Sequence, residues 1–113
     1  MKQFKVIFAA IVMMLTSQAM MAQTTVKGVL MDETLGEAEP FATVRVFKAG
    51  KTQKPVAMFL TNENGEFKQE VKGKGRFDIV FSSIGKEDLK QTVTLGQENP
   101  LDMGTLYIKE NAT

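Results

Sequence analysis

The side chains best suited to catalysis and metal binding at neutral pH are missing from this chain, which contains neither histidine nor cysteine. Their absence removes the usual general base, the commonest zinc ligands and the thiol nucleophile. Any chemistry must therefore use carboxylates, hydroxyls or lysines. Carboxylates lie close together in the sequence at three places, which are Asp32 with Glu33, Glu37 with Glu39, and Glu87 with Asp88. All three pairs fall in expected loops, and nothing marks a buried pocket that would shift their pKa values, so we interpret them as solvated charges.

One serine and one lysine match a catalytic spacing. Ser83-Ile84-Gly85-Lys86 has the S-x-x-K form of penicillin-interactive serine enzymes, in which the serine heads a helix and meets the lysine on one face. Here Ser83 is expected to end a strand, and Gly85 breaks the segment after it. The further motifs of such sites are not completed either, because Lys51-Thr52 lacks the glycine of K-T-G. We interpret the match as chance.

Two other short patterns carry little chemistry. The segment 62–66 places oxygen-bearing side chains near Gly65, like half of a calcium loop, but it lacks the full frame and the first aspartate of such loops. Asn111-Ala112-Thr113 is an N-x-T sequon, which has meaning only in a eukaryotic source. We therefore predict no catalytic, cofactor-binding or metal-binding residue and no cofactor. The first places to inspect for binding are the loop with Lys48, Lys51 and Lys54 and the loop 37–39, although solvated loops are the simpler interpretation.

The first 22 residues have the three regions of a secretory signal peptide. Lys2 and Lys5 give a positive start, 6–15 is an uninterrupted apolar run, and a polar, small-residue stretch follows. The apolar run is shorter than the roughly 20 residues that cross a bilayer as a helix. Cleavage after Ala22 is favoured and cleavage after Ala19 is the alternative, while a buried N-terminal helix is the structural alternative to a signal. The absence of cysteine excludes a lipid anchor on that residue.

The expected mature chain, 23–113, has the size of one domain. Without Lys2 and Lys5 the charge changes from 14 basic against 13 acidic residues to 12 against 13, so nothing attracts nucleic acid. Most of the methionines also lie in the signal. An exported chain without cysteine folds without disulfides, which is ordinary in a bacterial envelope. We expect a bacterial source and export to the periplasm or the outer membrane, with no membrane span in the mature domain.

The mature chain alternates short apolar stretches with turn residues and shows no helical periodicity. The pattern predicts seven strands, at 26–31, 41–48, 56–61, 66–71, 76–84, 89–95 and 101–108. Seven short strands with this spacing favour an all-β sandwich of two sheets with Greek-key connections, and an open barrel is the second possibility. Asn64-Gly65 predicts a β-hairpin between the third and fourth strands. The stretch 76–84 has apolar residues on both faces, which predicts a central, covered strand.

The order of these features resembles the carboxypeptidase-regulatory-like domain over nearly all of 26–108. The resemblance rests on four segments: Gly28-x-Leu30-x-Asp32, Gly36 with Pro40 to Val46, Thr61-Asn62-x-Asn64-Gly65-x-Phe67, and Phe81 to Gly85. It implies a seven-stranded transthyretin-like (prealbumin-like) sandwich. The chain is especially similar to copies at the N-termini of TonB-dependent receptors and outer-membrane β-barrel proteins of the Bacteroidetes, where the domain comes after a signal peptide and ends in a segment like 99–108.

The chain departs from the family pattern at two points. Relatives usually have Gly-Tyr where this chain has Gly85-Lys86, and Thr-Asp where it has Thr61-Asn62. The aromatic contact of relatives is therefore not carried over to Lys86. The family name implies no peptidase activity, because in carboxypeptidases this domain is an accessory beside a separate zinc domain. A related sandwich hydrolyses 5-hydroxyisourate with histidines and a C-terminal tetrapeptide, and this chain has neither.

The resemblance implies a non-enzymatic periplasmic accessory or interaction module, the N-terminal extension of a TonB-dependent receptor or barrel protein. Its expected partner is an envelope protein or the rest of such a receptor. The alternative is a free-standing envelope protein that binds carbohydrate or peptide, by strand addition for a peptide. The absence of tryptophan and the single tyrosine, Tyr107, argue against sugar stacking. An enzyme is the third hypothesis. The sequence leaves open whether the chain is complete or a fragment, and its oligomeric state.

Overall fold

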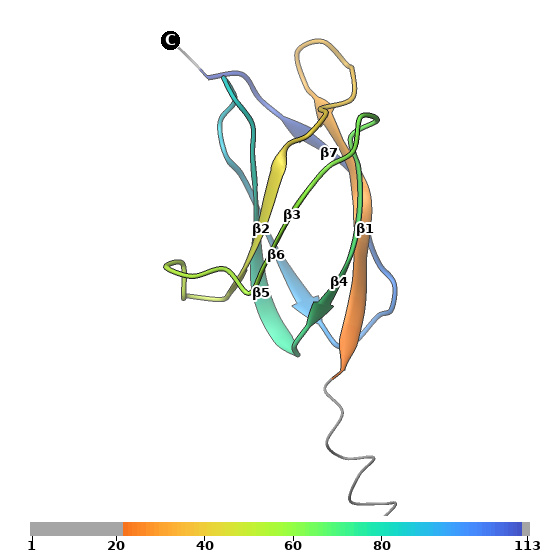
Figure 1. Ribbon diagram of the computed structural model, residues 1–113, viewed down its shortest axis with the longest axis vertical. Helices are drawn as coiled ribbons and strands as arrows, with labels where there is room; N and C mark the ends of the chain where they lie inside the picture. The colour runs from red at the N-terminus through yellow and green to blue at the C-terminus, as the bar shows by residue number, and fades with distance from the viewer. Residues whose placement is uncertain (1–21, 112–113) are drawn as a thin grey trace, which may run out of the picture.

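A computed structural model describes residues 22–111 as a sandwich of two β-sheets (Figure 1). One sheet has the strand order β4-β1-β7 and the other β3-β2-β5-β6. The seven strands are β1 (Gln23–Asp32), β2 (Thr43–Lys48), β3 (Ala57–Leu60), β4 (Glu66–Lys72), β5 (Gly75–Ser82), β6 (Leu89–Leu95) and β7 (Leu101–Ile108). The predicted seven-stranded all-β sandwich is confirmed. The predicted signal peptide lies outside the described residues, apart from Ala22, and β1 begins at the next residue, Gln23.

The core obeys the alternation of the strands, because successive side chains of a strand point to opposite faces. The inner faces of the two sheets contribute buried side chains from every strand except β3, whose Ala57 and Phe59 pack against this core while partly exposed. Together with Ala42, which directly precedes β2, the buried set is Val26, Leu30, Val44, Val46, Phe67, Val71, Phe77, Ile79, Phe81, Leu95 and Ile108. Phe67 connects the sheets, since its ring centroid lies 5.3 Å from that of Phe81 and 6.3 Å from that of Phe59. The central place predicted for β5 is confirmed, because β5 lies between β2 and β6. Its outer face is only partly covered, since Arg76 is exposed and Val80 is partly exposed.

The predicted hairpin between the third and fourth strands is wrong. β3 pairs with β2 in one sheet and β4 pairs with β1 in the other, so the segment between them is a corner that changes sheet. The turn chemistry itself is present: Gly65 has φ +73°, and the Asn62 side chain accepts the N–H groups of Asn64 and Glu66. The Gly65 carbonyl, however, accepts the N–H of Leu30 on β1. Turn residues thus reverse the chain but do not decide which strand it pairs with.

Six residues at the ends of expected strands lie outside the observed strands, and Phe41 and Ile84 are among them. Phe41 precedes β2 with a φ of +53°, a left-handed conformation that interrupts an extended strand. Ile84 comes after β5 in a turn closed by the N–H of Lys86, which donates to the carbonyl of Ser83. Both side chains are turned away from the core and are exposed.

β1 and β7 are parallel neighbours, which places Asp32 and Ile108 together at one end of the sandwich. Near the same end, the backbone of Lys86 in the β5–β6 turn forms an isolated antiparallel β-bridge with Glu110, which lies just beyond β7. Segments that are far apart in the sequence therefore converge here. No helix in the described part of the chain is long and apolar enough to cross a membrane.

Candidate functional site: a lysine and carboxylate cluster beside two exposed apolar side chains

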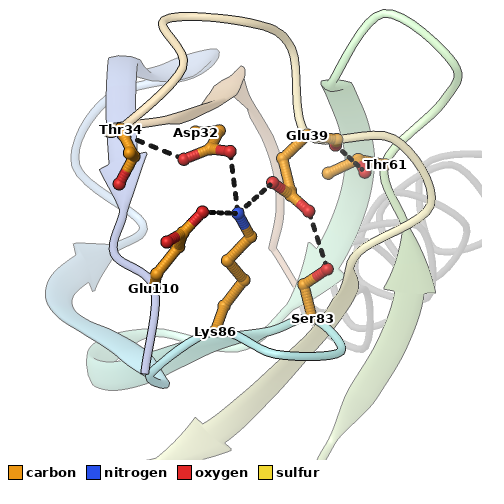
Figure 2. A network of polar contacts seen from close by, with 7 residues as sticks. All are labelled: Asp32, Thr34, Glu39, Thr61, Ser83, Lys86 and Glu110. Atoms are coloured by element: carbon orange, nitrogen blue, oxygen red, sulfur yellow. Dashed lines mark hydrogen bonds and ion pairs between the residues drawn. The ribbon is translucent and has the colours of Figure 1, made fainter. Parts of the chain in front are cut away.

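Four charged side chains from four separate segments meet at this end of the sandwich (Figure 2). Asp32 is the last residue of β1, Glu39 lies in the loop before β2, Lys86 lies in the turn after β5, and Glu110 lies beyond the end of β7. The Lys86 ammonium donates to Asp32 Oδ2 at 2.7 Å, and it lies 3.7 Å from Glu39 Oε2 and 4.0 Å from Glu110 Oε1. We call these four residues the Lys86 cluster.

The centre of the Lys86 cluster is withdrawn from water. The side chain of Lys86 is 12% exposed, that of Asp32 5% and that of Glu39 11%, whereas Glu110 is 54% exposed. Buried charges are tolerated when they are paired and hydrogen-bonded. Asp32 and Glu39 are therefore not the solvated loop charges that the sequence suggested. The prediction was wrong for these two because their partner lies far along the chain.

The remaining carboxylate oxygens also have partners. Asp32 Oδ1 accepts the N–H of Thr34 at 2.9 Å, and Glu39 Oε1 accepts the hydroxyl of Ser83 at 2.8 Å. Ser83 and Lys86, the two polar ends of the S-x-x-K match, thus both approach the carboxylate of Glu39: Ser83 donates to it, while Lys86 lies 3.7 Å away and donates to Asp32. This arrangement is unlike a serine nucleophile activated by a lysine.

Lys86 and Asp32 stabilise each other's charged form. The hydrogen bond from Lys86 holds the pKa of Asp32 below its ordinary value, against the opposing effect of burial. The same bond raises the pKa of Lys86, again against burial, and the negative charge of Glu39 adds to the rise. An amine with a raised pKa stays protonated at neutral pH and has no free electron pair for nucleophilic attack or proton abstraction. The centre of the cluster is a hydrogen-bonded ion pair of Lys86 and Asp32, with the carboxylates of Glu39 and Glu110 beside it.

Thr61 fixes the backbone beside the cluster. Its hydroxyl, which is buried, accepts the N–H of Ala42 at 2.8 Å and donates to the carbonyl of Glu39 at 2.9 Å. One side chain therefore satisfies two backbone groups of the loop that leads into β2. Thr61 is one of the positions on which the sequence resemblance rests, but the resemblance did not show this contact.

Two large apolar side chains stand next to the cluster and face solvent. Ile84 is fully exposed and Phe41 is 64% exposed, and both line a shallow hollow of about 480 Å³ together with Pro40, Thr43, Ser82 and Ser83. We call Phe41 and Ile84 the apolar corner. Phe41 lies two residues after Glu39 and Ile84 directly after Ser83, so the bond from Ser83 to Glu39 connects the two segments that carry the corner.

The other segments considered from the sequence do not form a site in the described residues. Glu33, Glu37, Glu87 and Asp88 are exposed, as expected for solvated charges, and so is the loop with Lys48, Lys51 and Lys54. The oxygens of the segment 62–66 serve the turn. Residues 22–111 contain no group of three or more acidic side chains placed to hold a metal ion.

Comparison with known proteins defines the fold. The sequence matches no protein-family model and no curated protein. Among solved structures, it is similar to GBS52, a minor pilin of Streptococcus agalactiae (TM-score 0.62, 11% identity, 82% of this chain and 47% of the pilin), and to BcpA, the major pilin of Bacillus cereus (TM-score 0.61, 12% identity, 80% and 31%). It is also similar to 5-hydroxyisourate hydrolase of Klebsiella pneumoniae (TM-score 0.54, 13% identity, 79% and 99%). The domain is a transthyretin-like β-sandwich.

These similarities concern the transthyretin-like fold alone, because the identities are low. The chain spans less than half the length of the pilin structures that it matches. The similar structures include both pilins and enzymes, so the fold by itself is compatible with either kind of function.

Proposed function

We propose that the domain is a non-enzymatic protein-interaction module of the cell envelope and that it binds a partner through the apolar corner. The observation that carries the proposal is the exposure of Phe41 and Ile84, at 64% and 100%, on segments held together by buried polar contacts. Single exposed apolar residues are common on protein surfaces, but neighbouring ones around a hollow are typical of interaction sites.

The backbone at the corner supports the same conclusion. A bulky residue with positive φ costs on the order of 1–3 kcal/mol and persists where the surroundings impose it, often at functional positions. Here the left-handed conformation of Phe41 turns an aromatic ring into water, which contributes nothing to the core. The buried contacts of Thr61 and of the Lys86 cluster hold the flanking backbone. A rigid, preformed surface loses little conformational entropy when a partner binds.

The Lys86 cluster supports a structural role over catalysis. Its lysine is held in the charged state, and the Ser83 hydroxyl donates to Glu39 instead of to a base. A serine enzyme of the S-x-x-K kind needs a serine whose proton can be taken by a neighbouring group. The cluster thus positions the apolar corner and performs no reaction of its own.

The cellular setting belongs to the same proposal. The signal-like residues 1–22 support export to the periplasm or outer membrane. The resemblance to carboxypeptidase-regulatory-like domains supports a place at the N-terminus of a TonB-dependent receptor or barrel protein. The pilins of similar fold are, by their names, subunits of surface assemblies, which agrees with a role in protein contacts.

A pull-down from envelope extract tests the proposal. The chain without residues 1–22 is immobilised as wild type, as a Phe41→Ser and Ile84→Ser double variant, and as a Leu35→Ser and Tyr107→Ser control that removes two exposed apolar side chains elsewhere. Wild type and control should retain the same outer-membrane protein, identified by mass spectrometry, and the double variant should lose it. Retention by all three forms, or by none, would contradict the proposal.

A further inference from the structure

β3 is the only strand at the edge of a sheet in the described structure that carries no charged residue. The two sheets end in β3 and β6 and in β4 and β7. β4 contains alternating acidic and basic residues, β6 contains Lys90, and β7 contains Asp102, whereas β3 reads Ala-Met-Phe-Leu. Proteins commonly protect free edges with charges, because an edge strand offers unpaired backbone N–H and C=O groups to another strand. β3 lacks this protection.

The side chains of β3 leave its edge open to a partner. Met58 and Leu60 on the outer face are 66% and 58% exposed, and the preceding Val56 is 54% exposed. On the inner face, Ala57 and Phe59 pack against the core but remain partly exposed, so the sandwich is not sealed along this side. A groove of about 620 Å³ runs beside Leu60, lined also by residues of β1, β4 and β7.

We propose that β3 is a homodimerisation edge, where two copies of the chain pair their β3 strands in antiparallel fashion around a two-fold axis through Met58. In such a pair, opposed residues lie on the same face of the sheet. The axis places Met58 opposite Met58 on the outer face and Ala57 opposite Phe59 on the inner face. Leu60 then lies opposite Val56, which precedes the strand and whose N–H already donates to the carbonyl of Val46 on β2. Every opposed pair is apolar, so the strand is complementary to itself, as a two-fold interface requires.

The charges that flank β3 also favour a second copy as the occupant. Lys51 and Lys54 precede the strand, and Glu63 and Glu66 come after it. Antiparallel pairing brings the basic end of one copy to the acidic end of the other, with Lys54 close to Glu63. A partner strand of another protein would need the same apolar run between the same two charges, which this chain already supplies.

The expected dimer is weak. β3 has four residues, and a pair of such short strands buries less than the roughly 1,200 Å² of a standard stable interface. Dimerisation should therefore depend strongly on protein concentration. The interface adds a second contact surface to the proposed function and is tested by different variants, so failure of one does not imply failure of the other.

Sedimentation velocity over a series of concentrations tests the proposal with the chain lacking residues 1–22. The wild type should change from monomer to dimer as concentration rises. Met58→Lys should raise the dimer dissociation constant by about tenfold or more, because two lysines would face each other across the axis. Thr94→Lys, which adds the same charge to an exposed position of the β6 edge, should dimerise like wild type. A synthetic peptide of residues 54–62 should compete with the dimer.

Hydrogen exchange of the wild type provides a second measurement that does not depend on the folding of a variant. The amides of β3 that face the free edge should become protected as concentration rises, and those of the β6 edge should not. A wild type that stays monomeric at every concentration would overturn the proposal. So would a dimer that Met58→Lys leaves intact, or concentration-dependent protection confined to another edge.

Discussion

Gly65→Ala should destabilise the domain far more than the same substitution at Gly36. Both glycines have left-handed backbones, with φ of +73° and +66°. A methyl group at Gly36 would meet no atom within 4 Å, whereas at Gly65 it would overlap the carbonyl oxygen of Leu30 and lie 3.1 Å from the backbone nitrogen of Glu39. The two variants therefore share the conformational penalty and differ in the steric one.

The magnitude at each position can be worked out from these contacts. The left-handed penalty for alanine is about 1 kcal/mol, and a reduced entropy of the unfolded chain offsets part of it. At Gly65 the Leu30 carbonyl must also move, although it accepts the N–H of Glu39 at 2.9 Å, and the N–H of Leu30 donates to the Gly65 carbonyl at 2.8 Å. Disturbing two buried hydrogen bonds adds about 2–4 kcal/mol. We expect a loss of about 3–5 kcal/mol for Gly65→Ala and about 1 kcal/mol or less for Gly36→Ala.

Thermal and urea unfolding followed by circular dichroism measure both variants. In a domain of this size, 1 kcal/mol corresponds to roughly 4–8 °C in the unfolding midpoint. Gly36→Ala should thus remain within about 8 °C of wild type, while Gly65→Ala should fall by at least about 12 °C. Equal losses for the two variants would refute the argument that close approach to β1, and not the turn conformation alone, requires glycine at position 65.

Three further outcomes are expected at the site. Thr61→Val should lower the free energy of unfolding, measured by urea titration, by about 2–4 kcal/mol, because a buried backbone N–H and a buried carbonyl lose their partner. Thr61→Ser keeps the hydroxyl and should cost less than about 1 kcal/mol. Similar losses of stability in the two variants would contradict the role of the hydroxyl. By calorimetry, Phe41→Gly should be more stable than Phe41→Ala by about 1 kcal/mol, because glycine adopts a positive φ without the steric cost that alanine has. This is the reverse of the usual order of the two residues. If the alanine variant is the more stable one, the backbone at position 41 is not strained. The pKa of Asp32 lies below its ordinary 3.8 and the pKa of Lys86 lies above its ordinary 10.5. Their pairing should therefore stabilise the fold fully between pH 3.8 and pH 10.5. This stabilisation should be lost in acid, as pH falls through the lowered pKa of Asp32, and in base, as pH rises through the raised pKa of Lys86. In Lys86→Met, Asp32 loses its cation and its burial then favours the protonated carboxyl. The unfolding midpoint should fall at neutral pH, and the loss of stability that wild type shows as pH falls through the lowered pKa of Asp32 should become smaller or disappear. An unchanged profile of unfolding midpoint against pH would show that the pair contributes nothing.

The strands were predictable because their signals are local. The alternation of apolar side chains predicted which residues of β2 and β5 face the core, and glycine at position 65 predicted the turn. Which strands pair with each other was harder to predict from the sequence, as the wrong prediction of a hairpin between β3 and β4 shows. A turn signal describes a reversal of direction over a few residues, whereas the choice between β2 and β4 as neighbour of β3 depends on how both sheets bury their apolar faces.

The Lys86 cluster could not be predicted from local patterns. Asp32 and Lys86 are separated by 54 positions, and each lies among polar residues typical of loops. The one available signal was Lys86 itself, which stands where the resembled domains usually have tyrosine, since a lysine in place of an aromatic side chain needs carboxylate partners if it is buried. Phe41 was assigned to a strand for a related reason, because apolar character alone does not reveal a left-handed backbone.

The parallel pairing of β1 and β7 decides how the domain carries mechanical load. Gln23 starts β1 at one end of the sandwich, and Ile108 ends β7 at the other. Traction applied to these two positions pulls neighbouring strands in opposite directions along their length. The hydrogen bonds of the β1–β7 ladder are then sheared together instead of opening one after another, so a force along the long axis meets the whole ladder at once. A module between an anchored partner and a moving one would transmit tension through this pair of strands.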